Sequence, residues 1–195
     1  MTPPAPPTST TFLHRYSRTA MVLHWLVALL IGINLVLAWI VDFLPDEKVR
    51  LTIDTHKSIG ITVLGLAILR LLWRFAHSPP ALPGTYALWE RRASQAAHAL
   101  LYGLIFLLPL SGWLADSAWK DAATHPMKLF GLVLWPRISW ITNIDPTTRE
   151  ILHDAFGAVH EWTGYVLYAL LALHILGALK HQFIDKEKEL QRMWS

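Results

Sequence analysis

Long apolar segments alternate with shorter polar connections along this chain. Four segments are long enough to cross a bilayer, which takes about 20 residues of helix. We expect membrane spans at residues 19–41, 57–76, 95–115 and 157–180. Prolines and glycine that interrupt helices separate them, at Pro45, the Pro79-Pro80 and Pro83-Gly84 pairs, Pro126, Pro136 and Pro146. The pattern predicts an all-α fold, an integral membrane four-helix bundle.

Composition supports this fold class, since 53% of residues are hydrophobic and 16% are charged, against about 25% charged in soluble domains. The net charge of +3 is too small to indicate nucleic-acid binding. Cysteine is absent, which excludes disulfides, iron–sulfur clusters and covalent c-type haem attachment. We expect residues 1–15, rich in Pro and Thr, to be a disordered tail, and 16–195 to form the transmembrane domain.

The positions of lysine and arginine predict the orientation of the bundle. These residues gather at the N-terminus, the second connection and the C-terminus, whereas acidic residues dilute them in the first and third connections. Because cytoplasmic loops are enriched in Lys and Arg, both termini are predicted to be cytoplasmic. The third connection is the longest and contains Trp119, Trp135, Trp140 and the apolar run 127–134. We expect it to be an amphipathic cap on the membrane surface, with a substrate-gating lid as the alternative.

Four histidines within the predicted spans form two pairs at two depths. His160 and His174 are fourteen residues apart, so on a helix they share one face and lie about 21 Å apart. His24 lies near the inner end of the first span and matches the depth of His174, and His56 lies near the outer end of the second and matches His160. Facing histidine pairs in an apolar bundle are what b-type haem uses as axial ligands. We therefore predict two haem b groups, with iron bound by His24 and His174 and by His56 and His160.

A haem also needs space for its ring and partners for its propionates. Small residues lie near each pair, at Gly60, Gly164, Ala28 and Gly177, although ordinary helix packing explains such residues equally well. The propionate candidates are cations near the span ends: Arg18, Arg70 and Arg74 on the inner side, and Lys57 and Arg149 on the outer side. Snorkelling to the membrane interface is the alternative for each of them.

The other histidines receive different interpretations. His98 and His181 lie at cytoplasmic depth and are candidates for contact with quinone, or for His98 with a propionate. His153 is a spare outer ligand only if its helix extends that far. His14, His77 and His125 fall in flanks or loops and are interpreted as solvated surface residues.

The order of these residues resembles the bacterial cytochrome b561 family, which includes the superoxide oxidase type and is related to the cytochrome b subunits of nickel–iron hydrogenases. The resemblance covers the chain from Tyr16 onward and rests on Tyr16-Ser17, His24-Trp25, the run from His56 to Gly60, Arg70 and Arg74, His98 with Tyr102, the run from Pro109 to Gly112, His160-Glu161, His174, the run from Leu179 to Asp185, and Arg192-Met193. It implies a four-helix protein of the bacterial inner membrane with two b haems, the same ligand pairs, and electron transfer from periplasmic superoxide to ubiquinone.

Three functional hypotheses follow. The first is an oxidoreductase that passes electrons from a periplasmic donor, superoxide, to membrane ubiquinone. The second is a haem-bearing membrane anchor that relays electrons for a separate dehydrogenase or hydrogenase. The third is a metal-ion transporter with intramembrane histidines, which the absence of intramembrane carboxylates and broken helices disfavours.

Overall fold

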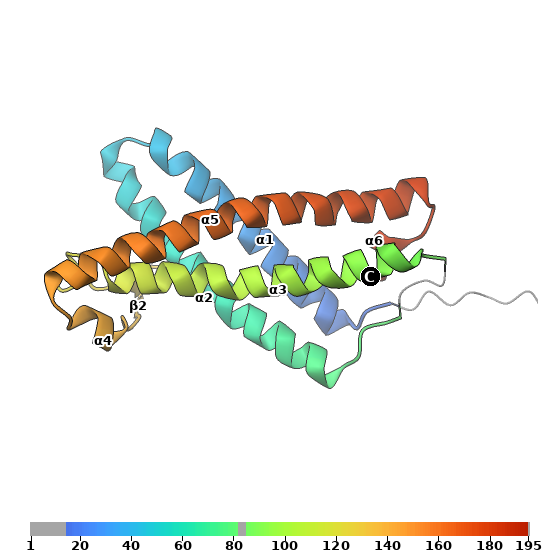
Figure 1. Ribbon diagram of the computed structural model, residues 1–195, viewed down its shortest axis with the longest axis horizontal. Coiled ribbons are helices and arrows are strands. Elements are labelled where there is room, and N and C mark those ends of the chain that lie inside the picture. The colour runs from blue at the N-terminus through green and yellow to red at the C-terminus, as the bar shows by residue number, and fades with distance from the viewer. Residues whose placement is uncertain (1–14, 82–84, 195) are drawn as a thin grey trace, which may run out of the picture.

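The computed structural model describes residues 15–81 and 85–194. Four long helices dominate it (Figure 1). They are α1 (Arg18–Ile40), extended by the short 3-10 helix Val41–Phe43; α2 (Asp46–Ala76); α3 (Leu88–Ser117); and α5 (Pro146–Leu179), extended by the π-helical turn Lys180–Ile184. All four are long and apolar enough to cross a membrane, which confirms the predicted all-α membrane bundle. The predicted tail up to residue 14, with His14, and the Pro83-Gly84 pair lie outside the described residues.

Three of the helices begin earlier than the apolar pattern predicted. The second starts at Asp46 instead of residue 57, the third at Leu88 instead of 95, and α5 at Pro146 instead of 157. Apolar runs mark the part of a helix that lies in lipid, and the helix continues beyond it where its first turn is capped. Asp145 Oδ1 accepts from the Thr148 amide at 2.9 Å, and such a cap satisfies an N–H group that has no partner within the helix.

The helices pack as two antiparallel pairs, α1 with α2 and α3 with α5, joined along α2 and α3. In Figure 1, α3 and α5 run side by side while α1 and α2 cross them obliquely. The largest buried cluster contains residues of α1, α2 and α3: Val27, Ile59, Val63, Ala67 and Ile105. Many large apolar side chains outside this core are exposed along the helices, as lipid-facing residues are in a membrane protein.

The connection between α3 and α5 folds against the outer end of the bundle. It contains an antiparallel hairpin, β1 (Lys128–Leu129) with β2 (Val133–Leu134), and the single turn α4 (Ser139–Thr142). Buried Asp116 holds this region, because its carboxylate lies 2.5 Å from Lys57 Nζ and 2.8 Å from Arg137 Nε. The segment predicted to be an amphipathic cap thus contains a hairpin and a helical turn, and the ion pairs of buried Asp116 hold it against the bundle.

The C-terminal segment covers the opposite end of the bundle. After α6 (Glu189–Arg192), the carbonyl oxygen of Met193 accepts from Trp25 Nε1 at 2.7 Å. The amide of Tyr16 donates to the Arg192 carbonyl at 3.1 Å. Both described ends of the chain therefore lie at the same side of the bundle.

Candidate functional site

The outer histidine pair is formed by His56 of α2 and His160 of α5. Their ring centres are 6.0 Å apart, with the ring planes at 78°. His56 Nδ1 lies 3.2 Å from the Asn34 carbonyl oxygen, and His160 Nδ1 lies 2.9 Å from the Leu108 carbonyl oxygen. A carbonyl oxygen only accepts hydrogen bonds, so both Nδ1 atoms carry the proton and both Nε2 atoms keep a free lone pair. This is the tautomer of a metal-ligating histidine whose second nitrogen is oriented by the backbone.

A cavity of about 830 Å³ surrounds this pair. Cofactor pockets typically measure about 300–1,000 Å³, so the volume suits a large planar group. Four glycines contribute to the lining together with the two histidines: Gly60, Gly112, Gly157 and Gly164. Gly60 and Gly164 were predicted to provide space for a ring, and no atom lies within 4 Å of a Cβ built on Gly164.

The inner pair, His24 of α1 and His174 of α5, has a similar spacing. Its ring centres are 6.4 Å apart, with the planes at 71°. His24 Nδ1 is buried and has no hydrogen-bond partner among the described residues, and buried polar atoms of this kind call for a ligand. The cavity here is only about 70 Å³, so a porphyrin would require neighbouring side chains to rotate away.

Both spacings fit a metal ion shared by two imidazoles. Two metal–nitrogen bonds of about 2 Å each, placed in line, account for about 4 Å, and the distance from each nitrogen to its ring centre supplies the remainder. The ring spacing of both pairs therefore fits bis-histidine ligation of a metal ion, and the outer pair also has a cavity large enough for a haem ring.

The other predicted candidates lie at different distances from these cavities. Arg70 lines the inner cavity and lies over the Tyr102 ring at 5.2 Å, beside Arg74 at 5.6 Å. Lys57 lines the outer cavity, where it is paired with Asp116. The last two propionate candidates have other surroundings: Arg149 donates to the Thr142 carbonyl, and Arg18 is exposed at the start of α1.

Of the additional histidines, His98 joins the inner pair. Its ring centre is 5.4 Å from that of His174, and it lines the same cavity. The helix does extend to His153, which lines the outer cavity and whose Nδ1 atom lies 2.8 Å from the Ala115 carbonyl oxygen, as the Nδ1 atoms of the outer pair lie beside theirs. His77 and His125 are exposed, as predicted.

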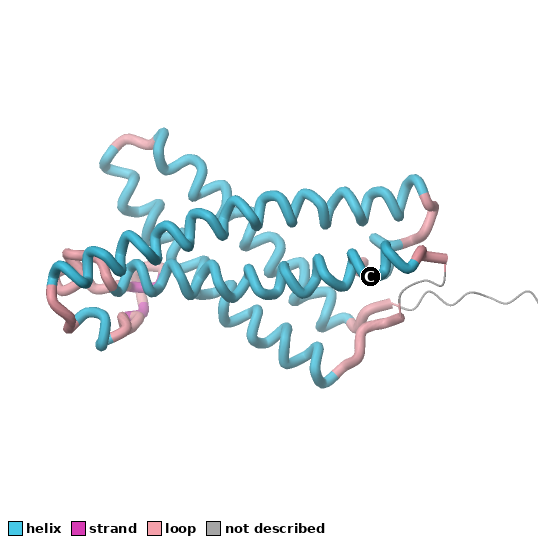
Figure 2. Tube along the Cα trace, in the orientation of Figure 1, coloured by secondary structure: helices cyan, strands magenta, loops and turns pink. Residues whose placement is uncertain are grey.

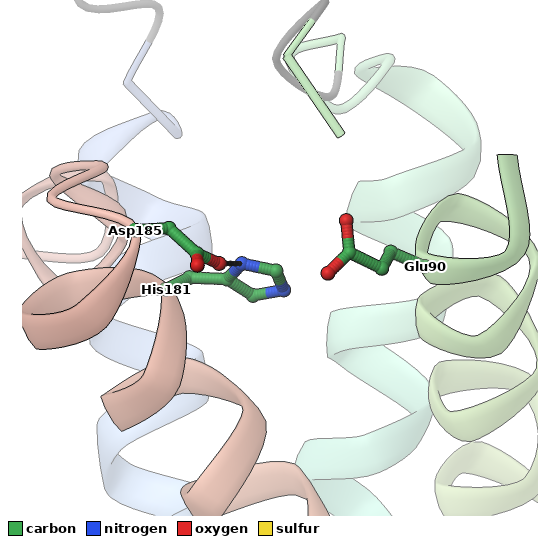
Figure 3. A group of neighbouring side chains, drawn as sticks. All are labelled: Glu90, His181 and Asp185. Carbon is green, nitrogen blue, oxygen red and sulfur yellow. Dashed lines mark hydrogen bonds and ion pairs between the residues drawn. The ribbon is translucent and has the colours of Figure 1, made fainter. Parts of the chain in front are cut away.

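His181 belongs to a charged cluster at the inner end (Figure 3). Ligand atoms of Glu90, His181 and Asp185 all lie within 4.8 Å of one another. Lys180 Nζ lies 2.7 Å from both carboxylates, so the protein supplies a cation to this cluster. The Lys180 ammonium, hydrogen-bonded to Asp185, holds the pKa of that carboxyl below its usual value. The Tyr86 ring stacks on His181 at 4.2 Å and fixes its orientation.

Sequence reasoning missed the residues that orient the histidines. Asn34 and Leu108 act through backbone carbonyls, which no side-chain pattern reveals. Gly112 had a signal, because it ends the Pro109–Gly112 run, and a Cβ there would lie 3.1 Å from His160 Cε1.

Replacing Gly112 by alanine is expected to displace the His160 ring by a few tenths of an ångström, because the added Cβ is too close to it. We expect a shifted visible spectrum and weaker haem retention on the outer side. Gly103→Ala is the control, since nothing lies within 4 Å of a Cβ at that position in the same helix. Spectra of the two purified variants test this, and identical spectra would contradict it.

Four membrane-crossing helices that bring histidines together in pairs at two depths are characteristic of membrane-bound b-type cytochromes. The family model described as prokaryotic cytochrome b561 matches residues 15–195. This chain belongs to the prokaryotic cytochrome b561 family, whose members are bacterial membrane electron-transfer proteins that bind b-type haem.

Relatives match the chain over nearly its whole length. Cytochrome b561 homolog 2 of Escherichia coli strain K12 is 33% identical over 92% of this chain and 90% of its own. Cytochrome b561 homolog 1 of the same organism is 26% identical over 93% of this chain and 97% of its own. A probable superoxide oxidase CybB of Yersinia pestis is 28% identical over 92% of this chain and 95% of its own. The predicted family is therefore confirmed.

Proposed function

We propose that this protein is a di-haem superoxide oxidase that transfers electrons from superoxide on the periplasmic side to ubiquinone in the bacterial inner membrane. Both termini are then cytoplasmic, and the His56–His160 pair faces the periplasm. The likeness to the probable superoxide oxidase of Yersinia pestis supports the substrate.

The observation that carries the proposal is that one continuous helix contributes one histidine to each of two facing pairs. His160 and His174 both lie on α5, and fourteen residues of helix separate them by about 21 Å. This distance covers most of a hydrocarbon core of about 30 Å. Electrons can thus cross most of the membrane within one small protein.

The residues of each pair determine the type of chemistry. A b-type haem held by His56 and His160, or by His24 and His174, would supply one-electron transfer and not activation of dioxygen. In the proposed reaction, two superoxide anions each lose one electron and leave as dioxygen. One ubiquinone takes up the two electrons with two protons and becomes ubiquinol.

Cations near the outer cavity favour the approach of an anion. Arg50 and Lys57 lie over the Trp119 ring at 5.2 and 5.8 Å, and all three residues line the cavity. Asp116 is shared by Lys57 and Arg137, so these three groups retain a net positive charge. The lining also contains Asp42 and Glu161, so the attraction of superoxide is assigned to the local positive charge around Lys57 and Arg137 and not to the net charge of the cavity.

The acceptor is assigned to the inner side. His98 lies beside the inner pair and His181 lies at the edge of the bundle among charged groups. We assign to these two histidines the contact with ubiquinone. Protons for its reduction then come from the cytoplasmic side.

Stopped-flow measurements on haem-loaded protein in proteoliposomes containing ubiquinone test the proposal. We expect superoxide supplied on the side of the outer cavity to produce one ubiquinol for every two superoxide anions consumed. Superoxide supplied on the opposite side is the control and should be ineffective. A b-type spectrum without superoxide-dependent quinol formation would contradict the oxidase proposal and favour the anchor-subunit hypothesis.

A further inference from the structure

We propose that residues 127–135, which we call the outer hairpin, insert into the outer leaflet of the bilayer and present an apolar face to lipid acyl chains. The hairpin belongs to the connection between α3 and α5, which was expected to lie on the membrane surface as an amphipathic cap, and the proposal places it deeper, in the leaflet itself. Its position, its exposed side chains and its backbone hydrogen bonds all support insertion. This inference is independent of the proposed substrate.

The first observation is the depth of the hairpin. The Phe130 amide donates to Ser58 Oγ at 2.9 Å. Ser58 follows the outer-pair residue His56 by two positions on α2, which runs inward, so it lies about 3 Å deeper along the helix. Just after the hairpin, the Pro136 carbonyl accepts from Trp113 Nε1 at 2.9 Å. Trp113 directly follows Gly112, which contacts His160.

These contacts place the hairpin beside the bundle at the level of the outer pair, and not above its end. Figure 1 and Figure 2 show the two short strands near the end of the bundle where the connection between α3 and α5 lies, and β1 packs against α2. The outer pair lies near the outer ends of the expected spans 57–76 and 157–180, in helices that are long and apolar enough to cross a membrane. Residues at the same level on the outside of the bundle therefore face lipid or the interface.

The second observation is the run of apolar side chains on the hairpin. The large apolar residues that it exposes are Phe130 at 56%, Leu132 at 86%, Val133 at 60% and Leu134 at 67%. Such a contiguous apolar patch is unfavourable in water and marks an interaction surface. Lys128 is the exposed charged residue of the hairpin, and its long side chain can reach the headgroup region.

The third observation is that the hairpin satisfies most of its own backbone. Lipid tolerates non-helical backbone only where its polar groups are paired. The strands pair with Lys128 opposite Leu134 and Leu129 opposite Val133. The Leu132 amide donates to the Leu129 carbonyl, and the Trp135 amide to the Met127 carbonyl, both at 3.0 Å.

The tip of the hairpin has the tight geometry that this pairing needs. Phe130 and Gly131 both have positive φ values, 50° and 73°. Positive φ at consecutive turn residues matches the twist of a short hairpin, but it is unfavourable for phenylalanine. The hydrogen bond from its amide to buried Ser58 supports this conformation at the level of the outer pair.

The surface of the adjacent helices indicates what covers the apolar face of the hairpin. The apolar face of the hairpin continues the lipid-facing surface of the membrane-crossing helices, so acyl chains cover both. On its inner side, Met127 is buried and lines the outer cavity. The hairpin thus couples one wall of the outer cavity to the bilayer.

Site-directed spin labelling tests the proposal directly, because the chain contains no cysteine. Nitroxide labels at Leu132→Cys, Leu69→Cys and Ala123→Cys would be compared in proteoliposomes of haem-loaded protein. Leu69 is an exposed residue within α2 and serves as the lipid reference, while exposed Ala123, in the same connection, is the aqueous reference. The measurement is the ratio of collision rates with oxygen, which dissolves in lipid, and with a water-soluble nickel chelate.

We expect the ratio at Leu132 to approach that at Leu69 and to exceed the ratio at Ala123 severalfold. A ratio at Leu132 equal to that at Ala123 would overturn the proposal. So would low accessibility to both reagents, since a protein partner or a second copy would then cover the hairpin. An unchanged haem spectrum in all three labelled variants shows that each retains the native bundle.

Discussion

Replacing His160 by alanine is expected to remove the outer haem and to halve the haem content of the purified protein. The His160 ring centre lies 6.0 Å from that of His56 at the outer cavity, and the Leu108 carbonyl and the Ser111 hydroxyl hold its Nδ1 atom in place. Alanine offers no ligand, and water cannot reproduce a bis-histidine site. The inner pair, about four helical turns away on α5, retains its group. The haem content per polypeptide, measured by pyridine haemochrome absorbance, tests this expectation.

His77→Ala is the matched control for this experiment. His77 is exposed at the end of α2 and stacks on Trp73, so its removal should leave the haem content unchanged. A His160→Ala protein with full haem content would refute the assignment of the outer pair. The same would follow if both variants lost haem equally, because the loss would then reflect the general stability of the bundle.

Replacing Asp116 by alanine is expected to have the largest effect on stability. Its side chain is 3% exposed and lies between Lys57 and Arg137. Removing one member of a buried ion pair leaves uncompensated charge and costs about 3 kcal/mol. Arg137 donates to the carbonyls of Ala122 and His125 in the connection between α3 and α5. Without Asp116 it would lose the carboxylate that fixes its position. For a chain of this size, we expect the thermal midpoint in detergent to fall by roughly 10 °C.

Asp54→Ala separates this effect from the general loss of a carboxylate. Asp54 pairs with Arg50 one turn away on α2, and both side chains are more than 40% exposed. Exposed pairs of this kind contribute about 0.3–0.5 kcal/mol, so the midpoint should barely change. Equal decreases in the thermal midpoint of the two variants would contradict a stabilising role of the buried ion pairs of Asp116.

The apolar pattern predicted the membrane bundle because a helix that crosses lipid needs about 20 consecutive, mostly apolar residues. It placed the inner end of the second span and the outer end of the third span to within two residues, but it missed the extension of α2 from Asp46 and that of α3 from Leu88. The α2 extension begins with the acidic residues Asp46 and Glu47, which stabilise the first turn of a helix. It is therefore helical although it is not apolar. Hydropathy cannot report helix that lies outside lipid.

The histidine pairs could be predicted because helical rise converts sequence separation into depth. The depth argument paired His24 with His174 and His56 with His160, and the structure brings the same residues together. It could not predict the tautomers, since the accepting carbonyls of Asn34 and Leu108 depend on the packing of neighbouring helices. The closeness of His98 to His174 also depends on helix rotation, which the sequence pattern does not determine.

The helix pairing has a consequence for how the protein is assembled. α1 packs with α2, and α3 packs with α5, so each half of the bundle is a helical hairpin. Each histidine pair takes one residue from the first half and one from the second. A group bound between them therefore ties the halves together, and its binding free energy adds to the stability of the assembled bundle. We therefore expect haem-free protein to be less stable and more readily proteolysed than the loaded protein.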